Sequence, residues 1–207
     1  MMKFSTKPLT KLKNECKEFI LASSSPQRKE ILTALGLKFK VIPSHVDEGH
    51  NGLTKTDEIV SHLAYKKAYE IAIKNPGEWV IGSDTLVLLS NGKISEKPID
   101  RADAKETILS YSGSHCDVYS GLTLIKETEG SVIEHTGYEK TRIHFDKLTN
   151  EQIEEYLDSE EWQNRSGSMT IEGRGGRWIN NIDGCYWNVV GLPVNLLKEF
   201  ILESGEK

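Results

Sequence analysis

The order of predicted elements indicates a mixed α/β (α+β) protein. Three observations support this class: a short apolar run, serine turn and helix at 19–36, a long amphipathic helix at 56–75, and strand-rich hairpins within 79–145. The order is neither a regular alternation of parallel strands and crossover helices nor an all-β pattern. A chain of 207 residues can bury a substantial core. We predict a polar leader over 1–18 and a single domain over 19–207, because no linker or repeat divides the rest.

The first predicted strand covers 19–23 and ends in three serines. Ser25 has a side chain suited to a helix N-cap, and Pro26 is favourable at the first helical position. Gly36 is typical of the residue that follows a helix. The sequence therefore predicts a strand, a serine turn and a helix, with a second strand at 38–42.

The serine turn is also a candidate phosphate site. A helix that begins directly after a strand presents free backbone N–H groups and the positive end of its dipole to an anion. Ser23 and Ser25 would add hydroxyl groups, and Arg28, one turn into the helix, would add a fork of donors. An ordinary capped helix with a surface arginine accounts for the same residues.

A lysine interrupts the apolar stripe of the helix predicted at 56–75. Lys67 falls inside this stripe, whereas Lys66 falls outside it. A buried unpaired ammonium group is costly, so Lys67 must reach a carboxylate, a ligand phosphate or the solvent. The pattern alone leaves a ligand contact and simple extension to solvent open.

An acidic residue stands among the strand residues of 79–89. Two β-like runs flank a Gly-Ser-Asp segment at 82–84, and the Asn-Gly pair at 91–92 predicts a hairpin turn. Asp84 therefore lies within or at the edge of a strand, and the hairpin would return Lys97 near it. A carboxylate beside a cation suits phosphoanhydride hydrolysis, although a structural ion pair explains the same pattern.

The second half of the chain is expected to alternate hairpins with helices. The predicted elements are helix 100–110, strands 117–126 and 132–145, helix 149–159 with a Thr149/Gln152 capping box, strands 177–182 and 185–190, and helix 193–202. The segment at 165–177 is rich in glycine. Close backbone approach to a planar ligand, with Glu172 reading a base edge, would use glycines in this way, and so would a plain loop.

Composition excludes several classes of function. A formal net charge of −5 argues against a protein whose main affinity is for DNA or RNA. The three cysteines form no CxxC pair, the six histidines show no metal-ligand spacing, and no apolar run approaches the length of a membrane span. Signatures of P-loop, dinucleotide-binding, zincin and serine hydrolase enzymes are missing from the sequence. We expect a soluble cytoplasmic protein.

Taken in order, these segments resemble the Maf-like family of nucleoside triphosphate pyrophosphatases, which is related in fold to the inosine triphosphate pyrophosphatases. The matching stretches are Leu21 to Arg28, Val46-Asp47-Glu48, Leu63-Ala64 with Lys67-Ala68, Gly82 to Thr85, Lys97-Pro98, Ser112-Gly113 with His115, Gly167 with Gly173, and Asn188 to Pro193. The resemblance implies an elongated mixed sheet flanked by helices, with two lobes around a cleft. It also implies hydrolysis of a (d)NTP, including a modified one, to NMP and pyrophosphate.

The resemblance also implies roles for individual residues. Asp84 would be the catalytic carboxylate, and Glu48 would help with water or metal, so both are candidate ligands of a divalent Mg or Mn ion. The substrate-binding residues would be Ser23, Ser25, Arg28, Lys67, Lys97 and Glu172. The expected partner is a nucleoside triphosphate, with neither a nucleic acid nor a membrane, and we allow for a homodimer. The alternative is a non-catalytic nucleotide-binding regulator linked to cell division.

Two positions depart from the family pattern. Many members have an arginine where this chain has Gln27, and the pyrimidine-preferring subgroup usually has a glutamine where this chain has Glu172. A carboxylate can accept hydrogen bonds from the N1–H and N2–H₂ groups of guanine, whereas an amide serves thymine or uracil with a donor and an acceptor. Glu172 thus favours a guanine-type or modified base, while Thr85 and the 188–190 segment resemble the pyrimidine subgroup.

Overall fold

The computed structural model of the protein describes residues 18–205, so the predicted leader lies, except for Glu18, outside the described residues. One seven-stranded sheet runs through this part of the chain in the order β2-β1-β3-β5-β6-β7, and β4 pairs with β3 beside this path. The elements are β1 (Phe19–Leu21), α1 (Pro26–Ala34), β2 (Phe39–Val41), α2 (Thr56–Ala72), β3 (Trp79–Leu89), β4 (Ile94–Ser95), α3 (Arg101–Tyr111), β5 (His115–Thr128), β6 (Ser131–Phe145), α4 (Asn150–Asp158), the 3₁₀ turns η2 (Ser166–Ser168) and η3 (Arg174–Trp178), β7 (Ile179–Asp183), α5 (Tyr186–Val190) and α6 (Val194–Glu203).

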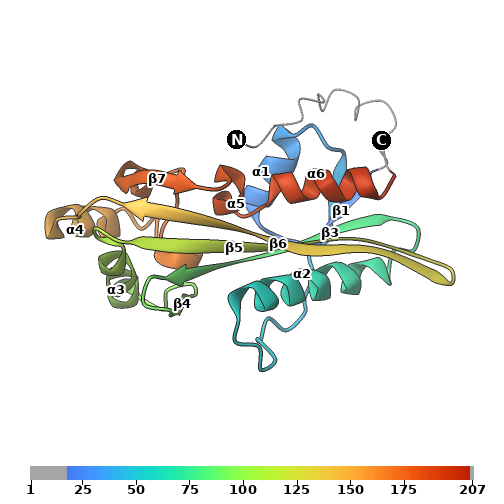
Figure 1. Cartoon of the computed structure of the whole chain (residues 1–207), viewed down its shortest axis with the longest axis horizontal. Helices are drawn as coiled ribbons and strands as arrows, with labels where there is room; N and C mark the ends of the chain where they lie inside the picture. The colour runs from blue at the N-terminus through green and yellow to red at the C-terminus, as the bar shows by residue number, and fades with distance from the viewer. Residues whose placement is uncertain (1–17, 206–207) are drawn as a thin grey trace.

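The sheet is mixed, as predicted. β1 pairs in parallel with β2 and β3, whereas β3, β5, β6 and β7 form antiparallel pairs. The long strands β5 and β6 run the length of the elongated molecule and carry helices at both of its ends (Figure 1). The Asn-Gly pair at 91–92 makes the predicted turn into β4, and Gly92 adopts a φ of 84° there.

Helices cover both faces of one half of the sheet. α1 and α6 lie on one face and α2 on the other (Figure 1). The alternation of side chains along β1 explains this, because Phe19 and Leu21 pack toward α1 and α6 whereas Ile20 packs toward α2. Both faces are apolar because both are buried.

The other half of the molecule has a separate apolar core. It is formed by α3, α4, β5, β6 and the segment around η3, with the aromatic side chains of Tyr111, Phe145, Tyr156 and Trp178 among its members. The capping box predicted at the start of α4 is present, since Thr149 and Gln152 exchange hydrogen bonds. The long strands β3, β5 and β6 join this half to the first, and α5 packs against both, through Val189 on this core and Val190 on the other.

β3 is one continuous strand, which corrects the prediction of two runs separated at 82–84. Its residues pair with β5 along their whole length, from Trp79 opposite Lys126 to Leu89 opposite Cys116. The Gly-Ser-Asp segment continues the alternation, so that Asp84 points toward α2 while Thr85 points toward α1 and α5. The polar residues stay in the strand because helices on both sides supply their partners.

The strand predicted at 185–190 is wrong, since these residues form the short helix α5. Tyr, Trp and Val favour strands, but tertiary contacts override that preference here. The buried Asn188 side-chain amide donates to the Val118 carbonyl and to Thr141 Oγ1, at 3.1 and 3.0 Å. The backbone carbonyl of Asn188 accepts from the Ser120 hydroxyl at 3.0 Å. These bonds hold a helical turn against β5 and β6. Within the described residues, no helix is long and apolar enough to cross a bilayer.

Candidate active site

A cavity of about 790 Å³ lies between the two halves of the molecule. One half contributes the serine turn, α2 and the middle of β3, and the other contributes the end of α3, parts of β5 and β6, and the loop at 163–172. All of the predicted site residues line this cavity: Ser23, Ser25, Arg28, Glu48, Lys67, Asp84, Lys97 and Glu172. The structure thus brings together residues that lie far apart in the sequence, while their roles remain predictions.

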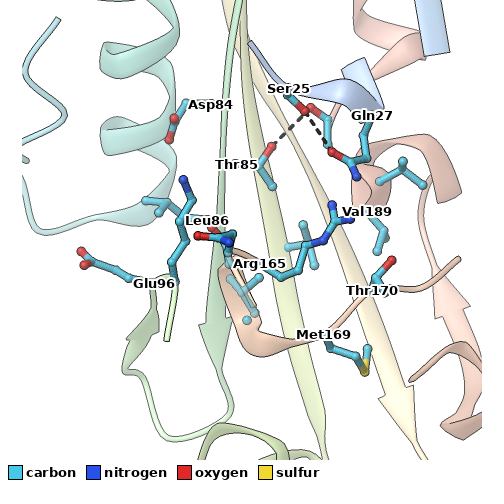
Figure 2. Close-up of a pocket in the computed structure, with 18 of the residues that line it drawn as sticks. Ser25, Gln27, Asp84, Thr85, Leu86, Glu96, Arg165, Met169, Thr170 and Val189 are labelled. Carbon is cyan, nitrogen blue, oxygen red and sulfur yellow. Dashed lines mark hydrogen bonds between the residues drawn. The ribbon is translucent and has the colours of Figure 1, made fainter. Parts of the chain in front are cut away.

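The serine turn is a capped helix start and a wall of the cavity at once. Ser25 is the N-cap of α1, and its hydroxyl accepts the Arg28 N–H at 3.4 Å. The same hydroxyl donates to Gln27 Oε1 at 3.3 Å, as the dashed line in Figure 2 shows. The cap and the phosphate site, which the sequence offered as alternatives, are therefore compatible at this helix end.

Arg28 is buried and holds three segments together. Its Nε donates to the Gly191 carbonyl at 2.9 Å, and its two terminal nitrogens donate to Ser23 Oγ at 3.0 Å and Thr85 Oγ1 at 3.2 Å. Burial lowers the pKa of Arg28, and the negative charges of Asp84 and Glu48 oppose that change. A guanidinium has five N–H donors, so this one can hold the turn, β3 and the end of α5 and still face an anion.

Lys67 is paired with two carboxylates. Its Nζ lies 2.6 Å from Asp84 Oδ1 and 2.6 Å from Glu48 Oε1. The Lys67 and Asp84 side chains are about one-tenth exposed, whereas the Glu48 side chain is 63% exposed. The hydrogen bond from Lys67 is the main cause of a lowered pKa for Glu48, which therefore stays ionised below its usual range. Two carboxylates and one cation thus meet at the cavity wall.

Two glycines let α2 approach the sheet closely enough to form this cluster. A Cβ atom on Gly82 would lie 2.3 Å from the Ala64 carbonyl oxygen, and one on Gly121 would lie 2.1 Å from the Val60 carbonyl oxygen. Gly121 is paired directly with Asp84 across β3 and β5. The glycines therefore set the depth at which Lys67 meets Asp84.

Lys97 and Glu172 lie at the rim of the cavity. Lys97 is exposed and comes shortly after β4, the second strand of the predicted hairpin. Its positive charge contributes to the lowered pKa of Glu48. Glu172 is exposed on the loop after η2, and one of its oxygens accepts the Thr170 hydroxyl at 3.0 Å. The second Glu172 oxygen has no hydrogen-bond partner within residues 18–205, so it can accept a hydrogen bond from a ligand.

The far end of the cavity is apolar, which the sequence did not reveal. Its walls include Val87, Tyr111, Cys116, Val118, Ile143 and Met169. The buried Tyr111 hydroxyl donates to the Gly167 carbonyl at 2.8 Å and fixes the glycine-rich loop. Burial raises the pKa of the Cys116 thiol to about 12, so this thiol is neutral near pH 7 and acts as apolar lining.

Sequence reasoning also missed two polar groups of the cavity. The Gly191 carbonyl accepts from Arg28, Ser83 and Thr85, at 2.9, 3.4 and 3.4 Å. Arg165, which Figure 2 places between Leu86 on β3 and Val189 on α5, also lines the cavity. A backbone carbonyl leaves no trace in a sequence, and a single arginine before a glycine-rich loop has no distinctive spacing.

The donor set suits a divalent cation only in part. No group of three or more acidic, histidine or cysteine side chains with metal-site geometry occurs within residues 18–205. Asp84 and Glu48 nevertheless bring two carboxylates to one point, since both contact the same Lys67 nitrogen. Mg²⁺ is commonly held by one or two carboxylates together with substrate phosphates. The residues therefore fit an ion that binds together with a phosphorylated ligand.

Comparison with known proteins agrees with this architecture. The dTTP/UTP pyrophosphatase of Acetivibrio thermocellus is 37% identical over 195 residues, which cover 91% of this chain and 96% of that protein. The dTTP/UTP pyrophosphatases of Clostridium botulinum (strain Kyoto) and Bacillus anthracis are both 38% identical, over 91% and 87% of this chain and 98% and 92% of those proteins. A family model described as Maf-like protein matches residues 18–204. This chain therefore belongs to the Maf-like protein family.

Proposed function

We propose that this chain hydrolyses a nucleoside triphosphate between its α- and β-phosphates, releasing a nucleoside monophosphate and pyrophosphate. The main support is one observation: Asp84 and Glu48 both form ion pairs with Lys67, in a cavity that has a basic, serine-lined end and an apolar end. The relatives named as pyrophosphatases cover nearly the whole chain, which supports the same reaction class.

The two ends of the cavity suit different parts of the substrate. The apolar end suits a base, which offers a flat and weakly hydrated surface. The serine turn at the start of α1, with Arg28, Lys67 and Lys97, suits the phosphate chain, because helix dipole and cations offset its negative charge. A volume of about 790 Å³ is within the range of small-ligand pockets.

Asp84 is proposed as the group that activates water. In the reaction, the water oxygen forms a bond to phosphorus, the bond to the bridging oxygen breaks, pyrophosphate leaves, and a carboxylate takes the water proton. Asp84 is positioned for this because Lys67 fixes its side chain at 2.6 Å within the cavity. Asp84 and Glu48 would hold Mg²⁺ or Mn²⁺, which when bound supplies positive charge to the phosphates.

The base is proposed to be thymine or uracil, with a guanine-type or modified base as the second candidate. The names of the relatives favour dTTP and UTP. The second candidate rests on Glu172, whose carboxylate only accepts hydrogen bonds and so suits a base edge with two N–H donors. A cytoplasmic location, a homodimer and a house-cleaning role in nucleotide metabolism remain predictions.

The test is a panel of natural and modified triphosphates incubated with Mg²⁺ or Mn²⁺, in which both products are quantified. We expect equal amounts of monophosphate and pyrophosphate, no orthophosphate, and no turnover after chelation of the metal. Tight nucleotide binding by calorimetry without hydrolysis of any member would instead favour the non-catalytic regulator linked to cell division.

A further inference from the structure

Four lysine and arginine side chains line the cavity, and they differ in how they are bonded. Arg28 donates to three protein oxygens, and Lys67 is paired with two carboxylates. Within residues 18–205, the side chains of Lys97 and Arg165 make no hydrogen bond or ion pair with another residue. Lys97 is already placed with the phosphates by its position after β4, so Arg165 is the cation without an assigned role.

Arg165 stands on an ordered turn between α4 and η2. Its backbone N–H donates to the Trp162 carbonyl at 3.3 Å, and its carbonyl accepts the Ser168 N–H at 3.0 Å. The side chain is half-buried, and Figure 2 shows it in the middle of the pocket, with Asp84 toward one end and Met169 toward the other. The guanidinium therefore lies between the end proposed for the phosphates and the end proposed for the base.

Two acidic residues close to Arg165 in the sequence, Glu161 and Glu172, make contacts with other residues. Glu161 accepts the Arg174 backbone N–H at 2.8 Å and forms an ion pair with the Arg174 side chain at 3.5 Å. Glu172 accepts the Thr170 hydroxyl. Partial burial removes some of the water around the guanidinium, and no ion pair or hydrogen bond within the described residues replaces it. An anionic group on a ligand would supply the missing partner.

We propose that Arg165 is a further substrate-binding residue, whose guanidinium pairs with a phosphate of the bound nucleotide from the side of the glycine-rich loop. The proposal rests on the proposed function, because it takes the ligand to be a nucleoside triphosphate. Arginine suits this position, since its planar fork of donors matches two phosphate oxygens at once. Lys67 and Lys97 would then hold the phosphate chain from the β3 and β4 side and Arg165 from the opposite side.

The experiment measures binding without hydrolysis. The probe is the α,β-methylene analogue of dTTP, whose bridging carbon prevents cleavage, titrated by calorimetry into the wild type, R165Q, R165K and R177Q with Mg²⁺ present. Arg177 is the matched control, because it belongs to the same segment but pairs with Glu155 at 3.0 Å outside the cavity. We expect R165Q to weaken binding by about 10- to 100-fold, R165K by less, and R177Q by less than about twofold.

Two results would overturn the proposal. One is R165Q binding the analogue within about twofold of the wild type. The other is an equal loss of affinity for the analogue and for thymidine, which would place the contact on the nucleoside. Thermal unfolding of each variant confirms that the protein is folded. Turnover of the wild type, measured in parallel, separates the two hypotheses: hydrolysis with an unaffected R165Q contradicts only the role of Arg165, and binding without hydrolysis contradicts only the proposed reaction.

Discussion

The two ends of the cavity hold their polar groups in opposite ways. At the end formed by α1, α2 and β3, the side chains of Arg28, Lys67 and Asp84 are buried and bonded to one another or to the backbone. At the end formed by the 163–172 loop, the Arg165 side chain has no hydrogen-bond or ion-pair partner within the described residues, and Glu172 uses one oxygen for Thr170. Groups held in place by hydrogen bonds suit bond breaking, so we call the end formed by α1, α2 and β3 the fixed end. Groups with free donors and acceptors suit ligand recognition, so we call the end formed by the 163–172 loop the recognition end.

The largest effect is expected from removing Lys67, the cation bonded to Asp84 at the fixed end of the cavity. We expect Lys67→Met to lower kcat/KM by about 100- to 1,000-fold, because the phosphates lose a cation and Asp84 loses the partner that orients it. Lys66→Met is the control, since Lys66 donates to the Asp47 carbonyl outside the cavity. Steady-state kinetics measure both variants, and equal effects of the two would show that the fixed end needs no specific cation.

The next largest effect concerns the packing beneath that end. We expect Gly121→Ala to lower the free energy of unfolding by about 3 kcal/mol, because its Cβ would lie 2.1 Å from the Val60 carbonyl oxygen and would push α2 away from Asp84. Gly137→Ala is the control, since its Cβ would come no closer than 3.4 Å to another atom. Urea unfolding that gives similar costs for both would contradict the close approach of α2.

A third prediction concerns the sheet beside the recognition end. Hydrogen bonds from Arg142, followed by those from Lys140, lower the pKa of the buried Asp117 to about 2 from a usual value of 3.8. A lowered folded-state pKa adds stability that is complete above about pH 4 and is lost as the pH falls through 2. We expect this contribution to be about 2 kcal/mol at pH 7.

The Asp117→Asn variant tests whether ionised Asp117 stabilises the folded protein. The variant should be less stable than the wild type at pH 7, and the difference should shrink as the pH is lowered from 4 toward 2. Chemical unfolding at a series of pH values measures it. A difference that stays constant over that range would mean that ionisation of Asp117 does not stabilise this part of the sheet.

The smallest expected effect is on base specificity, which we assign to the recognition end of the cavity. We expect Glu172→Gln to shift the ratio of kcat/KM for dTTP over a guanine triphosphate by about tenfold toward dTTP, because an amide both donates and accepts. The unfolding free energy should stay within about 0.5 kcal/mol, since Glu172 is exposed. An unchanged ratio would separate Glu172 from base recognition.

The same difference between the two ends explains what the sequence could predict. Lys67 and Asp84 violate the pattern of the helix and the strand in which they lie, and such violations are visible without a structure. The serine turn was visible because a cap and a helix start have a local signature. The mixed fold followed from elements with strong periodicity, of which α2 and the β5–β6 hairpin are examples.

The recognition end could not be predicted in the same way. Val87, Cys116 and Val118 line the cavity but have the same apolar character as residues of a closed core. Helix α5 forms from residues that favour strands, because Asn188 bonds to β5 and β6 from far away in the sequence. Arg165 lacks a local signature, and its place depends on how the loop returns across the sheet.

The role of Asp84 in catalysis is tested by measuring nucleotide binding and turnover separately in Asp84→Asn. We expect this variant to bind the α,β-methylene analogue of dTTP within about tenfold of the wild type, because Arg28 and Lys97 remain, while pyrophosphate release from dTTP falls to background. Pyrophosphate release at the wild-type rate by Asp84→Asn would contradict this role.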